Sequence, residues 1–135
     1  MKYRFLNHTA DIKFNAYGKS INEVFENSAL AMYNSMYSGK IKYKIKKKFS
    51  VKGKDLESLM YSFLEELLIL FDSENFIASR INVKVDEKKL TLKCAAYGDT
   101  TTNYKIGLTI KAVTYNSMFI KKTRTGYISQ VVLDV

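Results

Sequence analysis

The only histidine of the chain, His8, lies close to an aspartate, Asp11, within residues 7–18, NHTADIKFNAYG. A second aspartate, Asp134, is the last residue but one, and Val135 brings the oxygens of the final carboxyl group. Hard oxygen ligands without thiolates favour Ca²⁺, Mg²⁺ or Mn²⁺ over softer metals. If the strands that hold Asp11 and Asp134 are neighbours in one sheet, these oxygens converge and form a site for a divalent cation.

Each of these residues also has an ordinary structural role. An aspartate in a turn usually bonds its own backbone, and an aspartate near a chain end is usually solvated. In the same way, His8 can simply cap a turn. The residue types alone therefore leave two alternatives open, a metal site and a purely structural arrangement.

Motifs of common enzyme classes are missing from the sequence. It has no glycine-rich phosphate loop, no GxSxG nucleophile motif and no HExxH zinc motif. The one cysteine, Cys94, cannot form an internal disulfide or a multi-cysteine zinc site, and it fits a reducing cytoplasm. Glu65 and Glu66 fall in a predicted helix, where exposed carboxylates are routine. We therefore expect a cytoplasmic protein that is not an enzyme.

Lysine and arginine outnumber the acidic residues by 22 to 13, which gives a formal net charge of +9. Such a charge suits nucleic-acid binding. The densest run, residues 40–54, alternates lysines with Ile41, Tyr43 and Ile45, which predicts a strand with one apolar and one lysine face. Lysines also protect a sheet edge from aggregation. A solvated edge strand and a surface that contacts a polyanion both remain open.

Hydrophobic periodicity predicts one α+β domain over residues 1–135. Ser20 and Glu23 form a predicted capping box for a helix that ends at Gly39, and Asp55 caps a second helix with a wide apolar face. Period-two patterns predict the remaining strands, over residues 2–6, 12–17, 81–85, 90–96, 106–115, 118–122 and 127–133. The order of elements predicts a mainly antiparallel sheet that two helices cover on one face. No apolar run approaches the roughly 20 residues of a membrane span.

Several blocks of the sequence together resemble the archease family. They are HTADIKFNAYG, the helix start SINEVFENSA, the second helix KDLESLMYSFLEELLILF, the late strand IKAVTY and the ending VVLDV. The blocks occur in the family's order and spacing and cover nearly the whole chain. The resemblance implies a cofactor of the RtcB-type RNA ligase of tRNA splicing, which promotes guanylylation of the ligase and its multiple turnover. The alternatives are a chaperone or modulator of RNA-processing enzymes such as a tRNA cytosine methyltransferase, and an RNA-binding module.

The resemblance also implies a metal site at Asp11, Asp134 and Val135, with Ca²⁺ as the expected ion and Mg²⁺ or Mn²⁺ as alternatives. It places His8 and Thr9 in the turn beside this site. Our hypothesis is that the ion holds the two chain ends together and presents or transfers a divalent cation to the guanylylation site of the ligase. Contact with tRNA is expected to run indirectly through the ligase, and no membrane is involved.

Lys111, in the block IKAVTY, also matches the family pattern. It is implied to contact the ligase, a nucleotide phosphate or RNA, although a strand lysine can simply be solvated. The chain departs from the family next to this block, because Asn116 follows Tyr115 where a histidine is common, and Leu108 or Thr109 stands where an acid often precedes the strand. If those positions contact the ligase, this protein docks differently or depends on its own cognate ligase.

Overall fold

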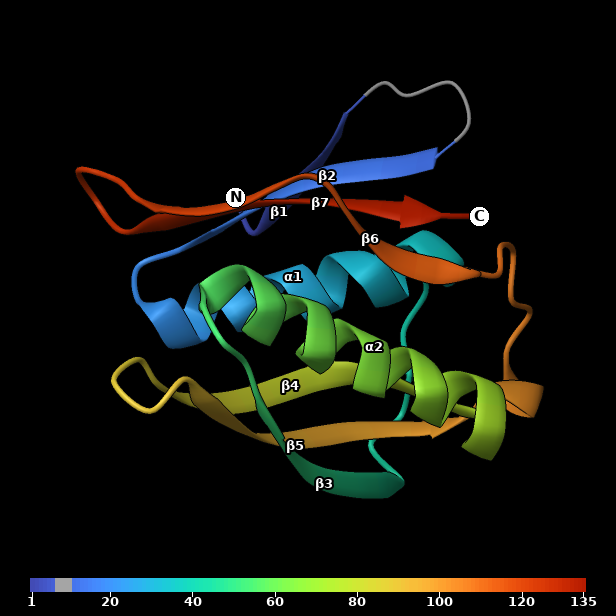
Figure 1. Cartoon of the computed structure of the whole chain (residues 1–135). Helices are drawn as coiled ribbons and strands as arrows, with labels where there is room; N and C mark the ends of the chain where they lie inside the picture. The colour runs from blue at the N-terminus through green and yellow to red at the C-terminus, as the bar shows by residue number, and fades with distance from the viewer. Residues whose placement is uncertain (7–10) are drawn as a thin grey trace.

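The computed structural model describes residues 1–6 and 11–135, and it has three layers (Figure 1). Two antiparallel sheets form the outer layers, and two helices lie between them. Sheet A contains, in spatial order, β1 (Tyr3–Leu6), β2 (Asp11–Gly18), β7 (Tyr127–Asp134) and β6 (Ala112–Lys122). Sheet B contains β3 (Ile45–Lys52), β5 (Thr91–Thr100) and β4 (Phe76–Asp86). The helices are α1 (Ile21–Met36) and α2 (Leu56–Glu74), and one 3₁₀ turn, η1 (Thr101–Asn103), follows β5.

The predicted α+β class, with two helices and antiparallel strands, is confirmed. The strands are divided between two sheets, whereas the sequence predicts a single sheet that the helices cover on one face. The reason lies in α1, where buried residues occupy most of the helix circumference, including the neighbours Ala31, Met32 and Tyr33. A helix on one sheet needs only an apolar stripe about 100° wide, so α1 has to be covered from two sides. Neither helix of the described chain is long and apolar enough to cross a lipid bilayer.

Side chains that accept backbone hydrogen bonds fix the start of both helices. At α1, Ser20 Oγ accepts from the N–H of Glu23 at 3.1 Å. The carboxylate of Glu23 accepts from the N–H of Lys19, and not from that of Ser20 as in the predicted capping box. At α2, the predicted N-cap Asp55 accepts from Ser58 N at 2.7 Å, and Ser58 Oγ accepts from Asp55 N at 3.1 Å. These bonds satisfy N–H groups that have no partner within a helix.

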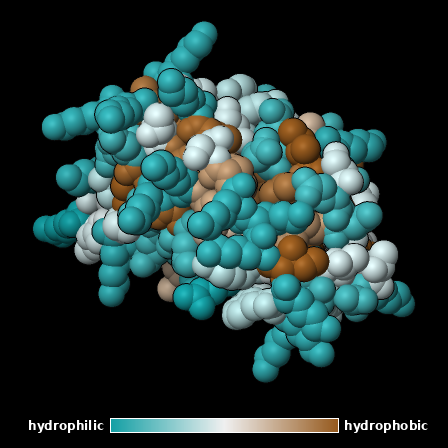
Figure 2. Space-filling view, turned by 90° about the horizontal axis from the view of Figure 1, so that it is seen from below, coloured by the Kyte–Doolittle hydropathy of each residue, from teal (hydrophilic) through white to brown (hydrophobic). Residues whose placement is uncertain are grey.

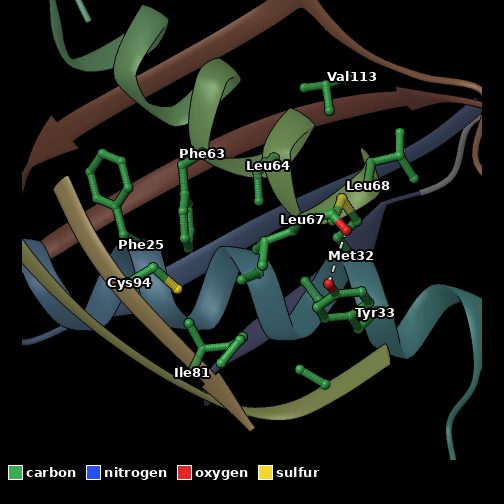
Figure 3. Close-up of a cluster of buried hydrophobic side chains, with 14 of the residues drawn as sticks. Phe25, Met32, Tyr33, Phe63, Leu64, Leu67, Leu68, Ile81, Cys94 and Val113 are labelled. Atoms are coloured by element: carbon green, nitrogen blue, oxygen red, sulfur yellow. Dashed lines mark hydrogen bonds between the residues drawn. The ribbon is translucent and has the colours of Figure 1, made fainter. Parts of the chain in front are cut away.

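The core lies between the sheets, where both helices contribute apolar side chains (Figure 3). The rings of Phe25 in α1 and Phe63 in α2 have centroids 5.9 Å apart. The hydroxyl of Tyr33 donates to the carbonyl of Leu67 at 3.1 Å, which ties the two helices together. Cys94 of β5 is buried in the same cluster, and this burial raises the pKa of its thiol to about 12. The thiol therefore stays protonated at neutral pH, as expected for an inert core cysteine.

Sheet B protects its two edge strands by different means. On β3, exposed lysines alternate with partly buried residues, as the sequence predicts for an edge strand. On β4, side chains of α1 cover the edge, because Glu26 Oε2 accepts from Val83 N at 2.9 Å and Asn22 Oδ1 accepts from Val85 N at 2.8 Å. Burial raises the pKa of Glu26, although the bond from Val83 opposes this shift. The β4 edge is thus closed to another strand.

The lysine-rich strand is shorter than the sequence predicts. A strand over residues 40–54 is expected, but β3 begins only at Ile45. Tyr43, which the alternation places on the apolar face, is 60% exposed. The segment before β3 is held in part by a side chain, because the N–H of Lys42 donates to the hydroxyl of Tyr104 at 2.9 Å. This long-range bond leaves no local signal in the sequence.

The predicted strands over residues 106–115 and 118–122 are one strand, β6, which begins at Ala112. Its pairing with β7 shifts between Thr114 and Phe119, where Ser117 has a φ of 54°. Extra residues of this kind form a bulge that bends a strand without ending it. The break that suggests two strands is therefore a bulge, and residues 104–111 form no strand.

Replacing Glu26 tests how the β4 edge is protected. Glu26→Ala removes the acceptor of the Val83 N–H, so we expect the free energy of unfolding to fall by about 1–3 kcal/mol. Glu26→Gln keeps a carbonyl oxygen and removes a partly buried charge, so it should stay within about 1 kcal/mol of wild type. Urea denaturation at pH 7, followed by circular dichroism, measures both. Equal losses in the two variants would show that the acceptor atom is not the stabilising feature.

Candidate functional site

The pairing of β2 with β7 brings the two predicted aspartate ligands together. The antiparallel register runs without interruption from Gly18 opposite Tyr127 to Asp11 opposite Asp134. Phe14 and its register partner on β7 are fully buried and face the helices, so by alternation the two aspartates lie on the outer face of sheet A. Directly opposite residues have Cβ atoms about 4.5–5.5 Å apart. Two carboxylates from opposite ends of the chain therefore share one small region of the surface.

The start of β6 and the end of the chain lie at the same place. Ala112 is opposite Asp134 in the pairing of β6 with β7. The N–H of the preceding residue, Lys111, donates to the carbonyl of Asp134 at 2.8 Å. Figure 1 shows the beginning of β2, the beginning of β6 and the C-terminus at one end of sheet A. Asp11, Lys111, Asp134 and Val135, all predicted site residues, are therefore neighbours.

A buried carboxylate, Asp99, holds the irregular segment that leads to Lys111. Asp99 accepts from the N–H of Thr100 at 2.8 Å and from the hydroxyl of Tyr104 at 2.9 Å. The bond from Thr100, followed by the hydroxyl bond, holds the pKa of Asp99 below its usual value. Further along the segment, the N–H of Gly107 donates to the carbonyl of Met36 at 2.9 Å. These bonds guide the chain from sheet B to the start of β6 in sheet A.

The donor set at this end of sheet A suits a hard cation. Carboxylates on directly opposite strand residues lie close enough for both to reach one cation. No group of three or more His, Cys, Asp or Glu side chains that could hold a metal occurs among residues 1–6 and 11–135. The predicted ligands at this end of the sheet are the carboxylates of Asp11 and Asp134 and a main-chain oxygen of Val135, and oxygen donors of this kind are the ones that Ca²⁺ prefers.

The structure also shows how the other residues considered in the sequence lie. Lys13 lies on the same outer face as Asp11, one row further along β2, so one positive side chain accompanies the two carboxylates.

His8 and Thr9, predicted beside the site, lie outside the described residues. Glu65 is exposed on α2, as expected for a solvated carboxylate. The neighbouring strands that the metal hypothesis requires are present, and metal binding itself stays a prediction.

The fold and this site define a small three-layer α+β protein with paired carboxylates at one sheet end. The family described as archease protein family (MTH1598/TM1083) matches residues 3–135. The chain belongs to the archease family. The protein archease of Sulfurisphaera tokodaii is 38% identical over 137 residues, which cover 99% of each chain. The protein archease of Methanosarcina acetivorans is 39% identical over 140 residues, covering 99% of this chain and 96% of that one.

Two solved structures share the fold. The solution structure of Methanobacterium thermoautotrophicum protein 1598 superimposes with a TM-score of 0.82 at 30% identity and covers 99% of both chains. The crystal structure of an archease from Thermotoga maritima, described as a possible chaperone, has a TM-score of 0.67 at 21% identity and covers 96% of this chain and 94% of that one. The second likeness concerns the fold alone. The two-sheet arrangement is thus shared by solved structures of this kind.

Asp99 provides a test of how the segment before β6 is held. Because its folded-state pKa is lowered, the carboxylate contributes stability that is fully present above its unfolded pKa of about 4 and disappears as the pH falls through the folded-state pKa. Asp99→Asn should therefore melt a few degrees below wild type at pH 7. The difference should shrink below about pH 4. Differential scanning calorimetry across this pH range measures it.

Asp72→Asn is the matched control, because Asp72 is exposed on α2 and outside these bonds. It should leave the melting temperature nearly unchanged at every pH. A melting temperature of Asp99→Asn equal to that of wild type at pH 7 would contradict the role given to Asp99.

Proposed function

We propose that this protein is an accessory activator of an RtcB-type RNA ligase, and that a divalent cation bound by Asp11, Asp134 and Val135 is part of this activity. Membership of the archease family supports the proposal. The single structural observation that supports it best is the register of β2 and β7, which sets Asp11 opposite Asp134. The preferred ion is Ca²⁺, with Mg²⁺ and Mn²⁺ as alternatives.

The chain's own residues give this site a rigid base. Ile12 and Leu133, the next register pair, face the core, and Leu133 is fully buried. The bond between Lys111 and Asp134 fixes the third strand beside them. The ammonium group of Lys111 is exposed at this end and can contact a phosphate or an acidic group of the ligase. A bound divalent cation would supply a Lewis acid for phosphate oxygens.

The only cysteine of the chain fits an accessory role better than a role as a catalytic nucleophile. The thiol of Cys94 is buried and, with its pKa raised to about 12, is neutral at physiological pH. A buried neutral thiol is a poor nucleophile. The proposed activity therefore places the chemistry of ligation in the ligase and assigns binding and positioning to this protein. We expect it to act in the cytoplasm, with tRNA contacted through the ligase.

The first test measures metal binding without the ligase. Ca²⁺ at about 100 times its dissociation constant should stabilise the folded wild-type protein by about 2.7 kcal/mol, because only the folded state joins the two strand ends. Asp134→Asn should lose this stabilisation, and Asp72→Asn should keep it. Thermal denaturation after chelator treatment, with Ca²⁺, Mg²⁺ or Mn²⁺ added separately, gives the comparison. An equal shift in Asp134→Asn, or no shift with any ion, would exclude the site.

The second test measures ligation by the cognate ligase under single-turnover and multiple-turnover conditions. The wild-type protein should stimulate multiple turnover strongly. Asp134→Asn should give no stimulation, although the metal-free variant should unfold within about 1 kcal/mol of wild type because Asp134 is exposed. Asp72→Asn should stimulate fully. Full stimulation by Asp134→Asn would contradict the metal role, and no stimulation by wild type would contradict the ligase role.

The alternative role, a chaperone of an RNA-modifying enzyme such as a tRNA cytosine methyltransferase, gives a different result in this assay. A chaperone would leave turnover by a folded ligase unchanged. It would reduce aggregation of its client, with or without the carboxylate of Asp134. The archease of Thermotoga maritima is described as a possible chaperone, and for the present chain this role stays the second candidate.

A further inference from the structure

The outer face of sheet B carries a dense group of positive side chains. On β5, Leu92, Cys94 and Ala96 are buried against the helices, so the residues between them point outward. The same alternation applies to the neighbouring strands, and no described element covers this outer face (Figure 1). Figure 2 looks onto it from below and shows extended hydrophilic side chains over most of its area. We call it the basic face and define it by Lys46, Lys48, Lys52, Arg80, Lys84 and Lys93, all exposed.

The strand register arranges these cations in rows across the sheet. One row runs from Arg80 through Tyr97 to Lys46, and another places Lys84 beside Lys93. Rows on one face of a strand are about 6.6 Å apart, and neighbouring strands are about 4.8 Å apart. The basic face is therefore about 20 Å long and 10 Å wide. This is the footprint of a short stretch of extended nucleic-acid backbone, and the row spacing is similar to the spacing of its phosphates.

The positive charge of the basic face is only partly offset by its neighbours. Within the part of the chain that the structure describes, none of the six cations forms an ion pair. The two acids at the ends of the face, Asp86 and Asp99, form hydrogen bonds with groups near them in the sequence. Asp86 accepts from the N–H groups of Lys88 and Lys89, both at 3.0 Å, in the turn after β4. Asp99 is buried beneath the segment that follows β5. With six cations against these two acids, the face carries a net positive charge, which favours an anionic partner.

The ring of Tyr97 holds two of the cations in place before any ligand binds. The ammonium of Lys46 lies 5.3 Å from the centroid of its ring, and the guanidinium carbon of Arg80 lies 5.5 Å from it. Cation–π contacts at this distance hold a charged group in place at little cost. Because the two cations come from the strands on either side of β5, the ring gathers both at one row. Tyr97 is a positioning residue in this arrangement.

A shallow depression lies at the middle of the basic face. It has a volume of about 490 Å³, and its lining includes Lys48, Lys84, Lys93 and Ala95. The small side chain of Ala95 lies between longer side chains on the neighbouring strands, so the surface is hollowed there. Apolar stems of lysine contribute to its walls, and the charged groups extend to the rim. A sugar or base can occupy the hollow while the surrounding ammonium groups contact phosphates.

Edge protection explains only part of this pattern. Lysines on β3 would blunt an exposed edge, but Lys93 lies on β5, the central strand of sheet B. Protein interfaces are depleted of lysine and rich in large apolar side chains at their centres, whereas lysines and a small alanine occupy the centre here. Membrane-binding surfaces insert Trp, Phe or Leu among their cations, whereas the uncharged side chains in these rows are Ala95, Tyr97 and small polar groups. Polar, strongly positive surfaces are typical of nucleic-acid interfaces.

We infer that the basic face binds a single strand of RNA through its sugar–phosphate backbone, without base specificity. Lysine and arginine contact the phosphates. The neutral side chains of Ser50 and Asn82, exposed between the cations, offer hydrogen-bond partners for the 2′-hydroxyl, which distinguishes RNA from DNA. This surface is on sheet B and contains none of the residues of the proposed metal site on sheet A. The inference does not rest on activation of a ligase.

Fluorescence anisotropy with a labelled oligouridine, in chelator and without ligase, tests this binding. The logarithm of the association constant should fall with the logarithm of the KCl concentration with a slope of about −3, if four phosphates are neutralised at about −0.7 each. The double variant Lys84→Gln/Lys93→Gln should lose affinity at least about tenfold and reduce the slope by about 1.4. The double variant Lys105→Gln/Lys122→Gln loses the same charge away from this face and should bind nearly as wild type.

Tyr97 variants separate positioning from net charge. Tyr97→Phe keeps the ring and should bind as wild type, while Tyr97→Ala releases Lys46 and Arg80 and should weaken binding several-fold. No binding of oligouridine at low salt, or equal losses in the two lysine double variants, would overturn the inference. Binding of oligodeoxyuridine, oligoglutamate or phosphatidylserine vesicles as tight as that of oligouridine would also overturn it, because the face would then not select RNA.

Discussion

The antiparallel pairing of β2 with β7 is the constraint on which the proposed site depends. This pairing joins the first and last parts of the chain in the centre of sheet A, and its register puts Asp11 opposite Asp134. A shift by one residue would turn every side chain of β7 to the other face. Such a shift would bury Asp134 and expose Leu133, which is fully buried. The hydrophobic core therefore enforces the register that brings the two carboxylates together.

The three-layer arrangement leaves two outer faces with different side chains. Both sheets bury their inner faces against α1 and α2, so each sheet presents one face outward. Sheet A places paired carboxylates and the start of β6 at one end, whereas sheet B presents rows of lysine and arginine. Opposite faces of a small protein can contact two partners at once. An accessory protein that holds a cation toward an enzyme and a strand of RNA on its far side would use both.

Local sequence patterns predict much of this fold. The remaining features depend on contacts between distant segments, which local patterns do not reveal. Period-two alternation and the caps at Ser20 and Asp55 predict the helices and most strands, because those signals lie within a few residues. The division into two sheets depends on pairings between distant segments and is not encoded locally. The bond from Lys42 to Tyr104 and the cover of the β4 edge by Glu26 likewise join groups that are far apart in the sequence. At the site, residue types predict oxygen ligands, but only the register shows that the two aspartates are neighbours.

The most direct measurement of the central claim is an NMR titration of ¹⁵N-labelled protein with Mn²⁺. Paramagnetic broadening is strongest near the bound ion, so it locates the ion without relying on any variant. The amide signals of Asp11, Lys111 and Val135 should broaden first, and that of Lys93 on the outer face of sheet B should stay sharp. Broadening centred on the exposed acids of α2, or none at the paired ends of β2 and β7, would contradict the account.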